Sequence, residues 1–168
     1  MTRNLVAGLV ALTWMMPGCS QADRQVVQNK EVVRQAHERV WSQGDLSAID
    51  ELYAADFVCH FLVGPEWRGR EGVKEAVTNH RRSFPDWKEE IEDIIAEGDR
   101  VVTRFRSSGT HRGEFMGLKP TLKRTRIEGI SILRMADHKI AEEWEVMDLY
   151  GAFKLMGAFP QVSETVTV

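Results

Sequence analysis

The spacing of hydrophobic positions changes along the chain. In residues 26–53 and 69–84 the apolar residues recur every three or four positions, as in helices that bury one face. In residues 57–63 and 87–149 apolar and polar residues mostly alternate, which predicts strands. The helices come first and most of the strands follow at hairpin distances. The sequence therefore predicts an α+β fold, with N-terminal helices packed on a curved, antiparallel or mixed sheet.

Breaker residues divide these regions into elements. Gly44 and Asp45 are suited to end the first helix and cap the second. Gly98-Asp99 and Asp137-His138 are turn signals between consecutive strands. The predicted helices cover residues 26–41, 46–53 and 69–83, the predicted strands cover residues 57–63, 87–97, 100–111, 123–135 and 139–148, and a short helical tail covers residues 149–157.

The last predicted strand carries carboxylates on both faces. Alternation places Glu142 and Asp148 among apolar side chains, whereas Glu143 and Glu145 fall on the opposite face, which we expect to be solvated. A carboxylate on an apolar face must be paired, protonated or used chemically. Glu142 and Asp148 are roughly 20 Å apart on an extended strand, so they cannot act as a close pair.

These two carboxylates therefore receive different interpretations. Asp148 is the candidate catalytic residue, because an apolar setting raises the pKa of a carboxyl group toward the working pH of a general base. The alternative is that Asp148 caps the following turn or pairs with an arginine. Glu142 is expected to pair with Arg134 or Arg104, or to lie at the margin of the pocket.

Several histidines and one tryptophan are further candidates. His60 could donate a hydrogen bond to a substrate oxygen as a second catalytic residue, or be a core histidine bonded to a backbone carbonyl. His80 lies on an apolar helical stripe, where a core role competes with substrate contact. His111, in a glycine-rich connection, is expected to fix that loop or to contact a ligand. Trp144 would supply pocket wall or core.

Composition narrows the function classes. The 168 residues suit one compact domain, and 43% hydrophobic content is enough for a real core. The formal net charge of −3 argues against general nucleic-acid binding. The histidines show no metal-ligand spacing, and no glycine-rich loop links a strand to a helix, so we expect neither a metal nor a nucleotide cofactor. The expected ligand is a small hydrophobic molecule.

The N-terminus has the pattern of an export signal. An apolar run at residues 5–16 follows Arg3, and Gly18-Cys19 and a polar segment come next. This arrangement resembles a bacterial lipoprotein signal, which implies that residues 1–18 are removed and Cys19 is lipidated. The alternative is a plain secretory signal with an incidental cysteine. We expect an exported protein, tethered to a membrane only by its N-terminal lipid.

The rest of the chain then forms one domain between two flexible segments. Residues 19–25 are expected to be a linker, residues 26–157 the folded domain, and residues 158–168 a loose tail. Cys59 is the one cysteine left after Cys19, so the domain is predicted to lack an internal disulfide.

Five stretches carry a family resemblance. They are residues 41–46 (WSQGDL), 84–87 (FPDW), 96–101 (AEGDRV), 109–117 (GTHRGEFMG) and 140–148 (IAEEWEVMD). In order and spacing the chain resembles the SnoaL-like polyketide cyclases, or ester cyclases, of the superfamily that includes nuclear transport factor 2 and ketosteroid isomerase.

The resemblance implies a fold and a chemistry. The fold would be a conical pocket lined by helices and backed by a sheet, in a homodimer formed through the outer sheet face. The chemistry would be ring closure by intramolecular aldol condensation without metal or cofactor. An aspartate on the last strand would act as general acid/base, and Asp148 matches it. Two alternatives stay open: an exported, non-catalytic protein that binds a hydrophobic ligand or a partner, and a hydrolase or isomerase on the same scaffold.

The lipoprotein interpretation predicts a modified N-terminus. Mass spectrometry of the mature protein should show Cys19 as the first residue, with acyl chains attached, because the signal is removed directly before it. Cys19→Ser should abolish acylation and release the protein from the membrane fraction. An unmodified N-terminus downstream of Cys19 would contradict the interpretation.

Overall fold

The structure is a computed structural model, and it describes residues 21–61 and 66–159. In this part of the chain the helices are α1 (Gln21–Gln35), the π-helix η1 (Ala36–Ser42), α2 (Ser47–Leu52), α3 (Gly69–Ser83) and α4 (Leu149–Met156). The strands are β1 (Tyr53–Phe61), β2 (Trp67–Arg68), β3 (Lys88–Glu97), β4 (Arg100–Thr110), β5 (Arg124–Ala136) and β6 (Lys139–Met147).

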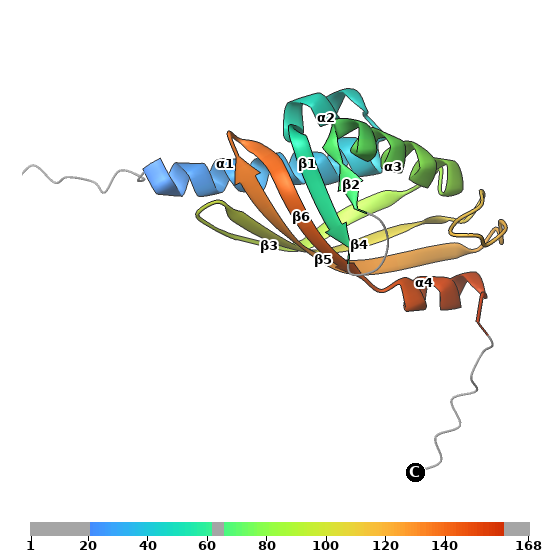
Figure 1. The fold of residues 1–168 in the computed structure, drawn as a ribbon. Coiled ribbons are helices and arrows are strands. Elements are labelled where there is room, and N and C mark those ends of the chain that lie inside the picture. Colours follow the sequence, from blue (N-terminus) through green and yellow to red (C-terminus); the bar gives the residue numbers. More distant parts are fainter. Residues whose placement is uncertain (1–20, 62–65, 160–168) are drawn as a thin grey trace, which may run out of the picture.

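The strands form one mixed sheet in the order β2-β1-β6-β5-β4-β3. β1 runs parallel to β6, and every other neighbouring pair is antiparallel. Helices α1, α2 and α3 lie over one face of the sheet, while α4 follows β6 and contacts β5 (Figure 1). The predicted α+β fold is confirmed.

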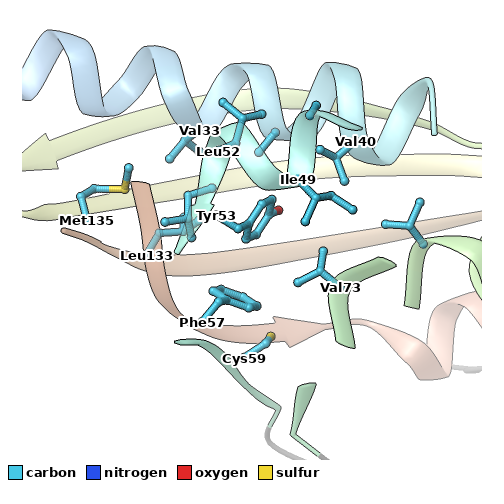
Figure 2. Close-up of a cluster of buried hydrophobic side chains, with 14 of the residues drawn as sticks. Val33, Val40, Ile49, Leu52, Tyr53, Phe57, Cys59, Val73, Leu133 and Met135 are labelled. Atoms are coloured by element: carbon cyan, nitrogen blue, oxygen red, sulfur yellow. The ribbon is translucent and has the colours of Figure 1, made fainter. Parts of the chain in front are cut away.

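Most of the core lies between these helices and the concave face of the sheet. Val33 and Val40 from the first helical segment meet Tyr53 and Phe57 of β1 and Leu133 of β5 (Figure 2). Burying each such side chain contributes about 1.5–3 kcal/mol. A second buried cluster, around Phe84, Trp87, Ile127, Ala152 and Met156, joins α4 to the end of α3 and to the sheet.

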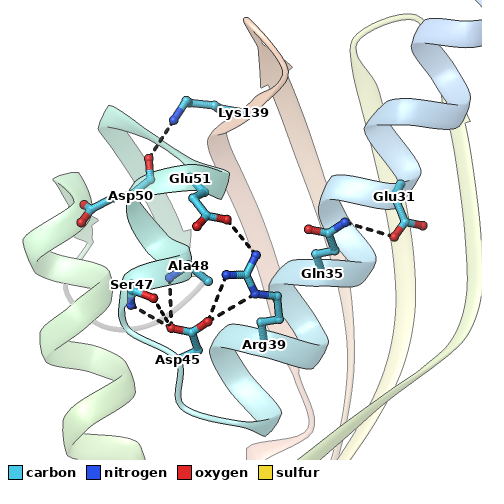
Figure 3. A network of polar contacts seen from close by, with 9 residues as sticks. All are labelled: Glu31, Gln35, Arg39, Asp45, Ser47, Ala48, Asp50, Glu51 and Lys139. Carbon is cyan, nitrogen blue, oxygen red and sulfur yellow. Dashed lines mark hydrogen bonds and ion pairs between the residues drawn. The ribbon is translucent and has the colours of Figure 1, made fainter.

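The connection between η1 and α2 is as predicted. Gly44 adopts φ +75°, a left-handed conformation that glycine tolerates best. Asp45 Oδ1 accepts hydrogen bonds from the backbone N–H groups of Ser47 (3.0 Å) and Ala48 (3.3 Å), and so caps α2. Arg39 also contacts Asp45 Oδ2 and thereby fixes the end of η1 against α2 (Figure 3).

The predicted linker at residues 19–25 is wrong over most of its length. Residues 21–25 form the first turns of α1. Their polar side chains allow helix formation without burial, and Gln25 Nε2 donates a hydrogen bond to Asn29 Oδ1 at 2.9 Å. Asn29 is itself buried and donates to the Gly98 carbonyl at 3.2 Å, which anchors this start of the helix to the β3–β4 turn.

The predicted signal at residues 1–18, Cys19 and all but the first two residues of the tail predicted at residues 158–168 lie outside the described residues, so these features stay predictions. The homodimer also stays a prediction. Within residues 21–61 and 66–159, no helix is long and apolar enough to cross a membrane.

Candidate functional site

A β-bulge determines which side chains of β6 point into the protein. Arg134 pairs with Glu142, but the next residue of β5, Met135, pairs with Ile140, so Ala141 is an extra residue on β6. Such a bulge reverses the alternation of side chains along the strand. Ile140 is therefore buried before the bulge, while Val146 beyond it is 56% exposed.

This reversal makes the predicted face assignment wrong. Beyond the bulge, Glu143, Glu145 and Met147 line an internal pocket, and Glu142 lies on the outer face. From Glu142 onward alternation separates the two groups of residues correctly, but the bulge places Ile140 on the inner side, apart from Glu142 and Val146. The hydrophobicity of Trp144 and Val146 led to the wrong choice of inner face.

The pocket lies between the two buried clusters and has a volume of about 270 Å³. It draws side chains from η1, α3, the sheet and the loop before β5. Its walls are largely aromatic and include Trp41, Tyr53, Phe61, Trp67, Trp87, Phe105 and Phe115. Met116, 68% exposed, forms part of its rim. A concave, mostly apolar site with a few polar groups is typical of small-molecule binding.

Gly129 shapes the floor of this pocket. It lies between Phe105 of β4 and Met147 of β6 in the sheet register. A Cβ atom at Gly129 would lie 2.5 Å from Phe105 Cζ, so only glycine lets the Phe105 ring cross over β5. The ring then covers the sheet on the pocket side, next to the carboxylates of β6.

Glu143 and Glu145 are the polar centre of the pocket. They are two residues apart on one strand, and Ser131 of β5 is paired opposite Glu145. Both side chains lie deep in the protein and keep accessible surface as lining of the pocket.

Burial acts strongly on these two groups. It raises the pKa of the Glu143 carboxyl above the ordinary glutamate value, against the lowering effects of Ser131 and His37. Burial and the charge of Glu143 raise the pKa of Glu145 well above that value. Two carboxyl groups coupled in this way release their protons in two separate steps, and one of them stays protonated to higher pH.

A histidine–carboxylate pair lies in the same pocket. His37 Nδ1 is 2.8 Å from Glu89 Oε2, and Trp87 Nε1 donates to Glu89 Oε1 at 3.2 Å. Burial lowers the pKa of His37, but the hydrogen bond and the charge of Glu89 outweigh burial and raise the pKa above its ordinary value. His37 belongs to η1, and π-helical segments are frequent at functional sites because they re-aim side chains.

Two further polar groups in the pocket have no hydrogen-bond partner among the residues that the structure describes. They are His80 Nε2 of α3 and the hydroxyl of Ser107 of β4, and both atoms are buried. Burial lowers the pKa of His80 to about 4, so the ring is neutral at pH 7. His80 lines the pocket, and its role as a substrate contact stays a prediction.

Three other predicted site residues lie together on the outer sheet face. His60 Nδ1 is 2.7 Å from Glu66 Oε1, and His60 Nε2 is 3.0 Å from Glu142 Oε1. Glu142 also pairs with Arg134 at 2.9 Å, which confirms the expected ion pair. The Trp144 ring stacks on His60 with the ring centroids 5.3 Å apart. None of His60, Glu142 and Trp144 lines the pocket.

Asp148 and His111 have structural contacts. Asp148 Oδ1 accepts a hydrogen bond from the Gly151 backbone N–H at 2.8 Å and caps α4, which was the alternative interpretation of this residue. Asp148 is exposed and is not part of the pocket lining, and its catalytic role stays a prediction. His111 is fully buried, and its Nδ1 accepts from the Thr121 backbone N–H at 3.3 Å, so it fixes the loop before β5.

The acid–base groups that the fold brings together were not among the site residues predicted from the sequence. These are His37, Glu89, Glu143 and Glu145, which come from η1, β3 and β6. The only sequence signal was the density of glutamates on both faces of the last strand. Within the described ranges, no group of three or more His, Cys, Asp or Glu residues is arranged to hold a metal ion.

The comparisons with known proteins agree with this fold. The sequence profile of the family described as SnoaL-like polyketide cyclase matches residues 31–154, so the chain belongs to that family. It is 29% identical over 112 residues to the aklanonic acid methyl ester cyclase DauD of Streptomyces sp. (strain C5). That alignment covers 61% of this chain and 69% of DauD.

Two solved structures have a fold similar to that of this chain. AclR of Streptomyces galilaeus superposes with a TM-score of 0.74 at 30% identity, over 84% of this chain and 88% of that one. An LEH-like epoxide hydrolase of M. tuberculosis superposes with a TM-score of 0.65 at 15% identity, over 80% of this chain and 92% of that one. The second comparison shows a shared fold alone.

The His37–Glu89 pair makes a prediction that NMR can check. Glu89→Gln removes the charge that opposes the effect of burial, so the pKa of His37 should fall below its ordinary value of 6.5. The His37 ring should then titrate at lower pH in the variant than in the parent protein. The exposed-face His60 serves as an internal control, because its partners are Glu66 and Glu142. An unchanged His37 titration would contradict the pairing.

Proposed function

We propose that this protein is a cofactor-free acid/base enzyme that closes a ring by intramolecular aldol-type chemistry on a small hydrophobic carbonyl compound. Family membership supports the reaction class. The observation that carries the proposal is the pair Glu143 and Glu145, held in an aromatic pocket next to His37 and Glu89.

The reaction needs a base, an acceptor carbonyl and a proton donor. Ionised Glu145 takes the proton from the carbon next to one carbonyl, and the electron pair of that C–H bond forms an enolate. The enolate carbon attacks a second carbonyl of the same molecule, which makes the new C–C bond and an alkoxide. A proton then returns to the alkoxide oxygen. The product is an isomer of the substrate, so no oxidant or reductant is needed.

The described side chains can fill these roles. The raised pKa of Glu145 brings its basicity closer to what enolate formation requires at neutral pH. His37, kept protonated to higher pH by Glu89, supplies positive charge and an N–H group to the developing oxyanion. Nε2 of the neutral His80 ring and the Ser107 hydroxyl have no partner in the described part of the chain and are available to orient carbonyl groups of the substrate.

The central test compares three carboxylates of the same region. With aklanonic acid methyl ester, the compound in the name of the relative DauD, Glu145→Gln should lower kcat by about 10²–10⁴-fold, the usual contribution of a positioned base. Glu142→Gln, on the outer face of the same strand, should leave kcat within about threefold of the parent value because it does not face the pocket.

Asp148→Asn tests the competing assignment, in which Asp148 is the base. Asparagine caps helices about as well as aspartate, so this variant should keep both its stability and its kcat close to those of the parent. A large loss of kcat in Asp148→Asn with normal turnover in Glu145→Gln would assign the base to Asp148. Binding of the compound without turnover in the parent protein would favour the non-catalytic alternative.

A further inference from the structure

The charges of the pocket do not balance. His37 is hydrogen-bonded to Glu89 at 2.8 Å and acts on Glu143 only through its charge. Among the described residues, no other cation lies beside Glu143 and Glu145. Among the described residues that line the pocket, there is neither a lysine nor an arginine. A buried carboxylate without a counter-charge is costly, and it either keeps its proton or gains a cation from outside the chain.

The walls of the pocket also favour a positive charge. Trp41 and Trp67 stack with their ring centroids 5.7 Å apart, and Phe61 meets Trp67 edge to face at 4.6 Å. All three rings line the same cavity as the two glutamates. Aromatic ring faces carry negative potential and attract organic cations, most strongly where water is excluded.

Unpartnered polar atoms point independently to a ligand in this cavity. Ser107 is 1% exposed and lines the pocket, yet its hydroxyl has no hydrogen-bond partner within residues 21–61 and 66–159. The buried Nε2 atom of His80, which also lines the pocket, likewise has no hydrogen-bond partner among the described residues. Buried polar groups are normally hydrogen-bonded, so these two atoms are explained by polar groups of a bound molecule.

We infer that the pocket binds an apolar molecule bearing a protonated amine, with the ammonium group between Glu143 and Glu145 and the apolar body against the aromatic wall. The inference concerns the same pocket as the proposed function and rests on that assignment of the site, but it does not require turnover. It excludes ligands that present a free carboxylate to this pair, because like charges would then meet without a cation.

Binding of an ammonium group should change the protonation of the pair. A neighbouring positive charge favours the ionised carboxylate, so the amine displaces the proton that burial retains there. The other titratable groups facing the pair are His37, Tyr53, Cys59, His80 and Glu89. Burial raises the pKa values of Tyr53 and Cys59 and lowers that of His80, so these three stay neutral near pH 7 and do not release the proton.

Three probes of one shape test the inference by calorimetry at pH 7. They are 2-naphthylmethylamine, 2-naphthylmethanol and 2-naphthoate, which are cationic, neutral and anionic at this pH. The parent protein should bind the amine at least about tenfold more tightly than the alcohol, equivalent to about 1.4 kcal/mol, and the carboxylate most weakly. Repeating the amine titration in buffers of different ionisation enthalpy should show proton release.

Variants separate the pair from the rest of the pocket. Glu143→Gln and Glu145→Gln, singly and together, should remove the preference for the amine while still binding the alcohol. Glu142→Gln on the outer face should keep the preference. The single variants keep the test available if the double variant does not fold.

Four outcomes would overturn the inference: equal or tighter binding of the alcohol, tighter binding of the carboxylate, an amine preference that survives in the glutamine variants, or no binding of any probe. Loss of turnover in Glu145→Gln without an amine preference would leave the proposed enzyme standing and reject the amine. An amine preference together with unchanged turnover in Glu145→Gln would reject the proposed enzyme and keep the amine-binding site.

Discussion

The structure depends on how two carboxyl groups are kept in an apolar cavity. Glu143 and Glu145 lie beside each other on β6, surrounded by aromatic side chains, and burial raises the pKa of both. The fold can hold such groups only if they share protons, meet a histidine or meet a ligand. The two carboxyl groups therefore require a cavity, because a fully packed core would leave the second carboxylate without a shared proton, a histidine or a ligand.

Local departures from regular structure assemble the site. The bulge at Ala141 turns Glu143 and Glu145 inward, and the π-helical turn of η1 places His37 against Glu89. Gly129 lets the Phe105 ring lie across β5. Each irregularity gives up some regular hydrogen bonding or packing, and proteins commonly accept that loss at functional sites.

The same irregularities explain how far the sequence could predict the molecule. Period-two alternation predicted strands at the positions of β4 and β5, and the glycine–aspartate pair at residues 44–45 marked the cap of α2. The phase of β6 could not be predicted, since an extra residue leaves no mark in the hydrophobic pattern. The pairing of His37 with Glu89 joins positions 52 residues apart, and no local pattern specifies such a contact.

The inner and outer faces of β6 place their carboxylates in different environments. On the outer face Glu142 is held by His60 and Arg134, so it is a partnered surface carboxylate. On the inner face the glutamates have the environment that acid/base chemistry requires. Glu143 and Glu145 should therefore act as one coupled pair that ionises in two steps above the ordinary glutamate range, and carboxyl ¹³C NMR titration of the folded protein measures these steps. Two coupled resonances should titrate above that range, and each should be missing from the respective glutamine variant. Titration of both groups near pH 4.5 would contradict this expectation.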